Sequence, residues 1–214
     1  MASPRPRLLI LATLALLVGC IPSPRRPVPV DRGTALDDAA LRQCLARLDT
    51  TTVRYARLPD REFGGGCEAR GAVQLRDIGL RTAGLGAMTC PLALAFANWV
   101  QSDLQVPAVG EYGSPVARIE TFGTYACRNV GGAATGRLSE HAFANAVDVA
   151  AFVLADGRRV SLLSGWEGDG RDRRFLRAVR DAACRRFRVV LSPDYNAAHR
   201  DHLHLDMGGG RLCR

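Results

Sequence analysis

Residues 199–206 read His-Arg-Asp-His-Leu-His-Leu-Asp, and the organisation of the chain follows from this stretch. Its second half alternates polar residues with leucines. If it forms a β-strand, the pleat places His202, His204 and Asp206 on one face and the two intervening leucines on the other. The leucine face suits a hydrophobic core, and the histidine face suits a polar site. The pattern therefore predicts a closing strand over residues 202–207 with a site on one side.

A second stretch, residues 139–148, supplies matching groups. It reads Ser-Glu-His-Ala-Phe-Ala-Asn-Ala-Val-Asp, and the two stretches together hold all four histidines of the chain. Six residues separate His141 from Asp148, which lets the chain leave a loop and enter a strand. Asp148 lies in an apolar run, where a buried carboxylate must be paired or coordinated. Two histidines and a carboxylate that leave one position open are typical of a catalytic zinc site. We predict that His141, Asp148 and His204 bind Zn²⁺.

The remaining two histidines and one arginine are the candidates for catalysis. His202, one pleat step from His204, is either a further ligand or the general base. His199 is either a hydrogen-bond donor to a water or oxyanion, or an ordinary loop histidine. Arg128 follows Gly-Thr-Tyr-Ala-Cys, and it either binds a substrate carboxylate or carbonyl, or is a surface residue. We predict catalytic roles for His202, His199 and Arg128.

Other assignments of the same residues are weaker. Ser139, His141 and Asp148 can be drawn as a catalytic triad, but no nucleophile-elbow pattern surrounds the serine. That triad would also leave the histidines near the C-terminus unexplained. Asp201 and Asp206 are expected to be solvated or to hold neighbouring side chains, and Asp201 could share the base role.

Composition indicates a soluble globular domain of ordinary type. The chain has 214 residues, 47% of them apolar and 23% charged, with a formal net charge of +8. This excess of arginine favours anionic surfaces such as phospholipid or peptidoglycan carboxylates. The arginines are spread along the chain rather than clustered with aromatic residues, so we do not expect nucleic-acid binding.

The N-terminus predicts export. Arg5 and Arg7 precede an apolar run over residues 8–18, which suits a signal segment and is short for a membrane span. The run ends in Leu-Val-Gly-Cys, which resembles a bacterial lipobox with Cys20 as the lipidated residue. An ordinary signal peptide with a chance cysteine is the alternative. We expect a lipoprotein signal peptide over 1–20, a Pro/Arg-rich linker over 21–34 and one domain over 35–214.

The cysteines fit an exported protein. Without Cys20 six remain, an even number that predicts three disulfides. No Cys-x-x-Cys pair is present, which disfavours a cysteine-based zinc site. The sequence leaves all fifteen possible pairings open, and pairing of neighbours in order is our working expectation. That order gives Cys44–Cys67, Cys90–Cys127 and Cys184–Cys213.

Hydrophobic periodicity predicts a mixed α+β fold. The elements are expected to form a small, mostly antiparallel sheet with flanking helices, stabilised by the disulfides. Helices are predicted over 35–49, 91–104 and 172–187, and strands over 52–58, 72–78, 116–122, 146–154, 158–163, 188–191 and 202–207.

These motifs together resemble a known family. The stretches 125–128, 138–141, 145–148 and 199–206, with the closing Cys-Arg, look like bacterial extensin-like C-terminal domain proteins. The resemblance covers roughly residues 40 to 214. That family is in turn similar to zinc peptidases that include lysostaphin-type enzymes, D-Ala-D-Ala metallopeptidases and hedgehog domains. The resemblance thus implies a zinc-peptidase-like fold of the hedgehog/D-Ala-D-Ala peptidase type.

The resemblance also implies site residues. In that group a His-x6-Asp motif and the second histidine of a His-x-His motif hold zinc, which matches His141, Asp148 and His204. The spacing of His199, His202 and His204 is similar to that of penicillin-insensitive murein endopeptidases, where the two upstream histidines assist the zinc water. Arg128 matches an arginine of the group, although its local sequence departs from the usual pattern.

The implied function is zinc-dependent hydrolysis of amide bonds in peptidoglycan peptides, as a carboxypeptidase or endopeptidase. The alternative is a non-catalytic, metal-stabilised lipoprotein that binds the cell wall, because hedgehog-type domains resemble this site and act as ligands. The expected partners are peptidoglycan and, through a lipid on Cys20, a membrane; a monomer is expected. Ile21 after the cysteine favours the outer membrane, on the periplasmic face of a bacterial cell envelope.

Overall fold

The longest strand, β8 (Ala146–Leu154), lies at the centre of a seven-stranded sheet. β7 (Val116–Gly123) pairs with it antiparallel along one edge. Along the other edge, β11 (Leu203–Asp206) pairs with its first half and β9 (Arg159–Ser161) with its second, both antiparallel. Only the two outermost pairs, β5 with β7 and β12 with β10, are parallel, so the mostly antiparallel sheet is confirmed. The remaining strands of this sheet are β5 (Arg81–Ala83), β10 (Val189–Leu191) and β12 (Leu212–Cys213).

The computed structural model describes Met1 and residues 36–168 and 170–214. The predicted lipidation site Cys20, the linker over 21–34 and the signal segment apart from Met1 lie outside the described residues. In the described part of the chain, no helix is both long enough and apolar enough to cross a bilayer.

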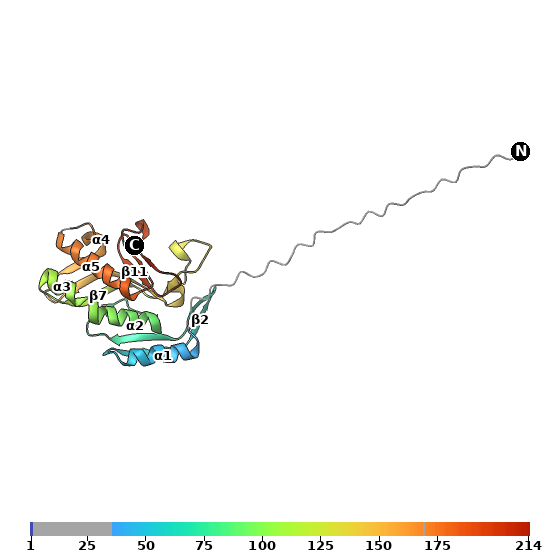
Figure 1. The fold of residues 1–214 in the computed structure, drawn as a ribbon, viewed down its shortest axis with the longest axis horizontal. Coiled ribbons are helices and arrows are strands. Elements are labelled where there is room, and N and C mark those ends of the chain that lie inside the picture. The colour runs from blue at the N-terminus through green and yellow to red at the C-terminus, as the bar shows by residue number, and fades with distance from the viewer. Residues whose placement is uncertain (2–35, 169) are drawn as a thin grey trace. The chain divides into compact units, whose positions relative to one another are not determined.

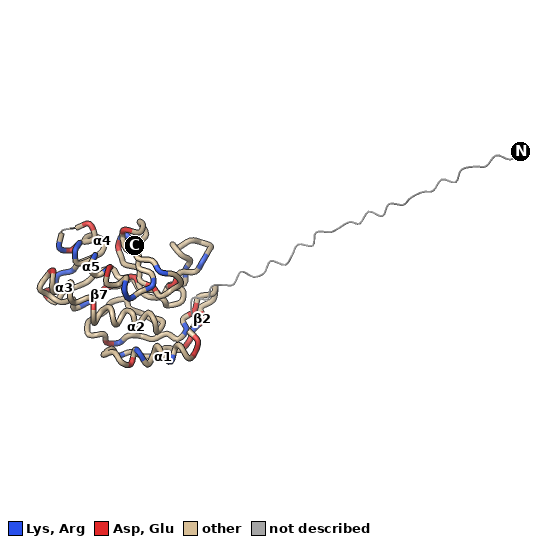
Figure 2. The backbone as a smooth tube through the Cα atoms, in the orientation of Figure 1, with Lys and Arg blue, Asp and Glu red and all other residues tan. Residues whose placement is uncertain are grey.

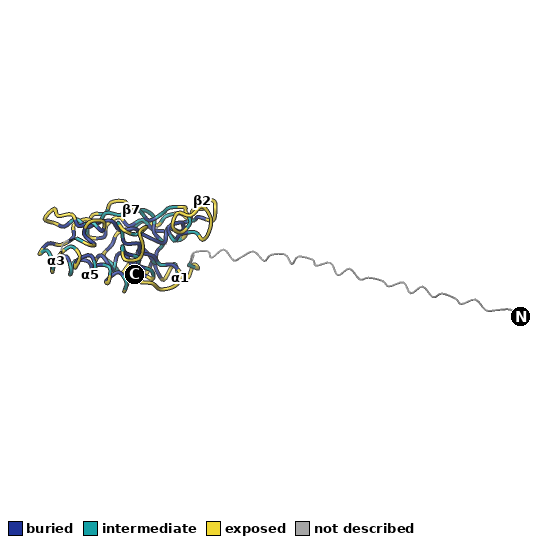
Figure 3. The backbone as a smooth tube through the Cα atoms, turned by 90° about the horizontal axis from the view of Figure 1, so that it is seen from above, coloured by how far each residue is buried: buried dark blue, intermediate teal, exposed yellow. Residues whose placement is uncertain are grey.

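Helices cover the apolar face of the main sheet. Seen from above, β7 lies on one side of the domain and α1, α3 and α5 lie on the other (Figure 3). α5 (Gly170–Arg186) turns Phe175, Leu176 and Val179 into the core, as its helical spacing predicts. These side chains belong to one core cluster with residues of β8, β10 and β11. The sheet is therefore buried on this face by hydrophobic contact.

α2 (Cys90–Asn98) is buried on nearly all sides. Helical structure continues beyond residue 104, where the sequence predicted that the helix would end. A π-helical segment, η1 (Trp99–Asp103), follows α2 and leads into α3 (Gln105–Tyr112). Trp99 is fully buried at this junction, with its ring against Phe152 and Phe187, and its indole N–H donates to the carbonyl of Val179. The packing of this indole between sheet and α5 accounts for the widened turn.

Smaller elements complete the domain around the N-terminal helix (Figure 1). α1 (Asp38–Asp49) begins where the carboxylate of Asp37 caps the amide of Ala40 at 2.7 Å. A three-stranded sheet has the order β1-β4-β6, and β2 and β3 form a hairpin that the sequence did not predict. These strands are β1 (Arg54–Arg57), β2 (Arg61–Gly64), β3 (Cys67–Ala69), β4 (Ala72–Asp77) and β6 (Met88–Thr89); the short helical elements are η2 (Val130–Gly132), η3 (Glu140–Phe143), α4 (Leu162–Gly165) and η4 (Ala197–His199).

Three disulfides form, but only one of the expected pairings is right. Cys184–Cys213 joins α5 to the last strand, as expected. The expected Cys44–Cys67 and Cys90–Cys127 bonds are wrong. The structure pairs Cys44 with Cys90 and Cys67 with Cys127. The reason is packing: α1 lies against α2, which brings Cys44 to Cys90, whereas the hairpin carries Cys67 to the loop that follows β7.

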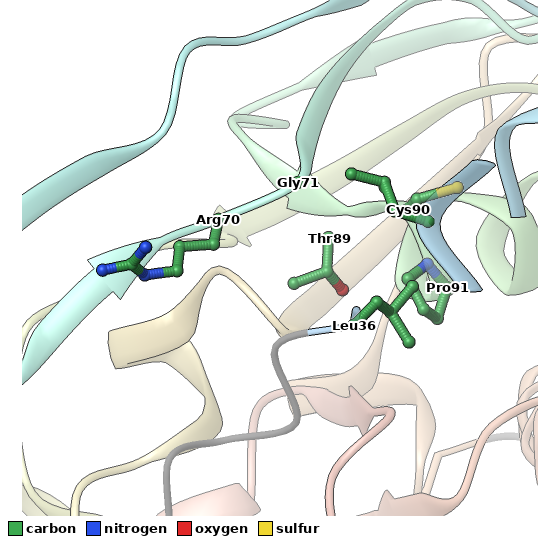
Figure 4. Close-up of a pocket in the computed structure, with 7 residues that line it drawn as sticks. Leu36, Arg70, Gly71, Thr89, Cys90 and Pro91 are labelled. Carbon is green, nitrogen blue, oxygen red and sulfur yellow. The ribbon is translucent and has the colours of Figure 1, made fainter. Parts of the chain in front are cut away.

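Two hollows lie beside the N-terminal helix. The smaller, lined by Thr89, Cys90 and Pro91 among others, holds about 20 Å³, room for about one water molecule (Figure 4). The larger, about 400 Å³, is open and is lined by residues of α1, α2 and the end of α5. None of the four histidines lines either hollow.

Candidate functional site

His141 is presented by a short helical turn. The turn is η3, and its first residues are capped by Ser139, whose hydroxyl accepts from the amide of His141 at 3.3 Å. Ala144 then takes a left-handed conformation, with φ of 53°, and directs the chain into β8. The hydroxyl of Ser139 therefore serves as a helix cap, which argues against the alternative Ser-His-Asp triad.

Asp148 and His204 are brought together by strand register. They lie directly opposite each other in the antiparallel pair of β8 and β11, so their side chains project from the same face. Leu203 and Leu205 are fully buried and belong to the core on the opposite face. The alternation predicted for this strand is confirmed, although β11 begins one residue later than expected, at Leu203.

Three donor atoms converge at this point. His141 Nε2 lies 3.1 Å from Asp148 Oδ1 and 3.2 Å from His204 Nδ1, and His204 Nδ1 lies 2.9 Å from the same oxygen. In a tetrahedral zinc site with ligand distances of about 2.0–2.1 Å, neighbouring donors are about 3.3 Å apart. All three residues are buried, and they form a group of potential metal ligands. Donor types and spacing therefore fit zinc.

The outer nitrogens of both imidazoles are held. His141 Nδ1 lies 3.3 Å from the carbonyl oxygen of Thr124, and His204 Nε2 lies 2.9 Å from Asp206 Oδ2. The other oxygen of Asp206 accepts from the amide of Gly208 at 2.8 Å. With a metal bound, each outer nitrogen would donate its proton to these partners, and each inner nitrogen would offer its lone pair to the ion.

The charges of the site reinforce one another. Burial opposes ionisation of Asp148, but hydrogen bonds from His141 and His204 outweigh it and hold the pKa of this carboxyl well below its usual range. Burial likewise lowers the pKa of His204, but hydrogen bonds to Asp148 and Asp206 raise it overall, to about 9. The cluster therefore attracts positive charge, because the carboxyl of Asp148 stays ionised although it is buried.

His202 and His199 lie beside the three donors rather than among them. His202 Nε2 is 3.6 Å from Asp148 Oδ1, and its Nδ1 is held by Asp201 at 2.9 Å. The ring of His199 lies 5.1 Å from that of His202, and its Nδ1 bonds to Asn196 at 2.7 Å. Burial lowers the pKa of His199 to about 4, and electrostatic interactions with His202 and His204 add to the effect. His199 is therefore neutral at neutral pH.

Arg128 approaches the same carboxylate from its other side. Its guanidinium is 3.9 Å from Asp148 Oδ2, whereas the histidines face Oδ1, and its side chain is 41% exposed. The backbone of Arg128 is held by a bond from the amide of Ser139 at 3.0 Å and by the neighbouring disulfide of Cys127 with Cys67. The structure thus brings all six predicted site residues into one cluster, with Arg128 partly open to solvent.

The family of the chain can be read from its sequence. The model of the family described as extensin-like protein C-terminus matches residues 42–214. The chain belongs to this family. No curated protein and no solved structure matches it. The extensin-like match includes every residue of the cluster, so the expected extensin-like resemblance is confirmed.

Some contributors to the cluster of this extensin-like domain were not predictable from residue type. The carbonyl of Thr124 that orients His141 is a backbone group, and any residue could supply it. Phe122 and Tyr195, whose rings contact His202 and His199, were also missed. The sequence held a partial signal, because Phe122 lies six residues before Arg128 and Tyr195 lies four residues before His199.

Proposed function

We propose that the chain is a zinc-dependent hydrolase of amide bonds in peptidoglycan peptides. The observation that carries the proposal is the position of His202. Its Nε2 faces Asp148 at 3.6 Å without belonging to the three converging donors, and its other nitrogen is held by Asp201. A site that only held a metal would have no use for a fourth, oriented imidazole. A hydrolytic site needs one as base and acid.

In this proposal His141, Asp148 and His204 hold the ion. Three protein ligands leave one position open, which distinguishes catalytic from structural zinc sites. Bound zinc would supply Lewis acidity, which polarises a carbonyl group and lowers the pKa of a water molecule. The outer partners, the carbonyl of Thr124 and the carboxylate of Asp206, keep both imidazoles turned inward.

Proton transfer falls to His202. Asp201 accepts a hydrogen bond from its Nδ1–H, so the lone pair of Nε2 points towards the three donors. Nε2 would take a proton from the attacking water and return it to the leaving amine, with Asp201 stabilising the charged ring between the two steps. His199, neutral and 5.1 Å away, would hydrogen-bond the water or substrate oxygen.

Arg128 suits the substrate class. Its exposed guanidinium beside the cluster can bind a carboxylate in two parallel hydrogen bonds, and peptidoglycan peptides carry carboxylates near their scissile amides. Elsewhere on the domain basic and acidic residues are interspersed (Figure 2), and arginines of α5 pair with acidic residues such as Glu111, Asp194 and Asp103. Any preference of the protein for a substrate with a carboxylate would therefore come from Arg128 at the site.

We further propose that the protein works as a lipoprotein of a bacterial envelope. The lipobox-like stretch would attach Cys20 to a membrane, and the linker would carry the domain on the periplasmic side. Three disulfides support an oxidising compartment.

A second candidate function has its own support. The three donors come from three separate elements, η3, β8 and β11, so a metal ion bound there would cross-link the fold. The domain would then be a metal-stabilised wall-binding module without catalysis. The two candidates differ in what His202 does.

The deciding experiment compares the wild type with His202→Ala on purified muropeptides, with products resolved by mass spectrometry. We expect cleavage to fall by about 10²–10⁴-fold while zinc content and thermal unfolding stay as in the wild type. Arg200→Ala, an exposed neighbour, is the matched control and should cleave normally. Full cleavage by His202→Ala would overturn the proposed mechanism, and a zinc-loaded wild type that cleaves no muropeptide would favour the binding module.

A further inference from the structure

Four rings form a row beside the three converging donors. The ring of Phe122 lies 5.8 Å from His202, His202 lies 5.1 Å from His199, and His199 lies 5.5 Å from Tyr195. The two ends of this aromatic row are open to solvent, with Phe122 62% and Tyr195 44% exposed. These two exposed rings bracket the histidines assigned to catalysis, so the four rings form one contiguous aromatic surface beside the site.

Phe122 lies where the pairing of β7 with β8 is irregular. Thr121 pairs with Val149 and Gly123 pairs with Asp148, so Phe122 is skipped on β7, and Ala150 is skipped on β8 between Val149 and Ala151. The two irregularities cancel, because the register is the same before and after them. Phe122 thus directly precedes the residue that pairs with Asp148, and its exposed ring lies at the level of the site.

Tyr195 is held from the opposite side of the row. The preceding residue, Asp194, accepts a hydrogen bond from the indole of Trp166 at 2.8 Å and an ion-pair bond from Arg177 at 2.8 Å. The guanidinium of Arg177 also stacks over the Trp166 ring at 4.7 Å. The next residue, Asn196, bonds to His199. Tyr195 is therefore fixed between two anchored neighbours, although its own ring is exposed.

We infer that the aromatic row is a subsite for an uncharged sugar ring, the amino-sugar part of a peptidoglycan strand. This inference rests on the proposed function and names the part of the substrate that the site takes beyond the peptide. The C–H face of a pyranose covers an exposed aromatic ring with little loss of conformational freedom. The Tyr195 hydroxyl and the Asn196 amide provide hydrogen-bonding groups beside the rings.

The distribution of charge sets the direction of the substrate. The arginine that suits a carboxylate, Arg128, approaches Oδ2 of Asp148, whereas the aromatic row begins on the side of Oδ1. A wall fragment has carboxylates on its peptide and neutral acetamido sugars on its glycan. The peptide thus lies towards Arg128 and the sugar towards the row.

The test uses a neutral sugar so that Arg128 cannot contribute. Binding of the N-acetylglucosamine tetramer to the zinc-loaded full chain is measured by calorimetry for the wild type, Phe122→Ala and Tyr195→Ala. We expect each variant to bind about tenfold more weakly, with unchanged zinc content. Leu163→Ala, which removes a side chain 64% exposed on α4, is the control and should bind like the wild type.

A second measurement separates this inference from the proposed function. Cleavage of a disaccharide-linked stem peptide is compared with cleavage of the same peptide without sugar. The wild type should cleave the sugar-linked substrate faster, and the ratio of the two cleavage rates should fall towards one in both aromatic variants. No sugar binding by the wild type, or an unchanged ratio in both variants, overturns the inference. Sugar binding without any cleavage overturns the proposed hydrolase and leaves the sugar subsite standing.

Discussion

His204 and Leu205 are neighbours in one strand, and both are buried, yet they are held by different forces. His204 lies among Asp148, His141 and Asp206, and hydrogen bonds and charge pairs join it to them. Leu205 lies in the core cluster, where contacts are non-directional. On the polar face, a shift of a few tenths of an ångström changes the geometry of the hydrogen bonds. On the apolar face, stability depends on how completely the side chains fill the available volume.

The comparison implies that the two faces fail in different ways. Removing a donor from the polar face should abolish binding of an ion and leave the apolar core intact. Removing volume from the apolar face should weaken the fold and leave the donor set intact. The three predictions below test this separation.

The largest effect is expected for His204→Ala. Loss of an outer hydrogen-bond partner can lower the zinc affinity of a site by about 100-fold. His204→Ala removes one of the three converging donors themselves, so its zinc affinity should fall further than that. Metal content by mass spectrometry measures it, with one equivalent expected in the wild type. His199→Ala is the matched control and should keep its zinc. Undiminished zinc in His204→Ala would show that the ion binds elsewhere.

Leu205→Ala should have its effect on stability instead. The side chain is fully buried, so its truncation should lower the free energy of unfolding by about 2–5 kcal/mol, as measured by denaturant titration of the metal-free protein. Leu163→Ala, on an exposed leucine, should change it by less than about 0.5 kcal/mol. If Leu205→Ala also lost its zinc stoichiometry, the two faces of β11 would be coupled.

A smaller effect is expected for Asp206→Asn. This change keeps the size of the side chain and removes the charge that holds His204, so zinc affinity should fall by about 10–100-fold in a competition titration. Asp201→Asn is the matched control. It should keep its zinc affinity and lose cleavage, because Asp201 orients His202. Equal zinc affinities in both variants would contradict the role assigned to Asp206.

Much of the site was predictable because it depends on simple periodicity. The alternation over 202–206 fixes which side chains share a face, and the register of β8 then brings Asp148 to His204. Burial of a charged residue in an apolar strand requires partners, which is why Asp148 was expected among the histidines. These inferences need only the pleat and the chemistry of side chains.

Features that depend on packing between distant elements were not predictable. Two disulfide pairings failed because cysteine spacing carries no information about which elements lie side by side. The β2–β3 hairpin was taken for a loop around its glycines. α3 was missed because Pro107 and Gly110, which disfavour a helix, lie within it and made residue 104 look like the end of the helix. The irregular pairing at Phe122 was not predictable either, since register irregularities arise from the pairing of two strands.

β11 lies between β8 and β10, both of which precede it in the chain. This order has a consequence for biosynthesis. A nascent chain that has not yet emerged through residue 206 carries only two of the three donors. It also lacks β11, the strand that joins β8 to β10 in the sheet. Its earlier strands can pair, but the three donors come together only when β11 has been made. A product truncated before β11 would therefore keep β8 and β10 and lack the assembled donor set.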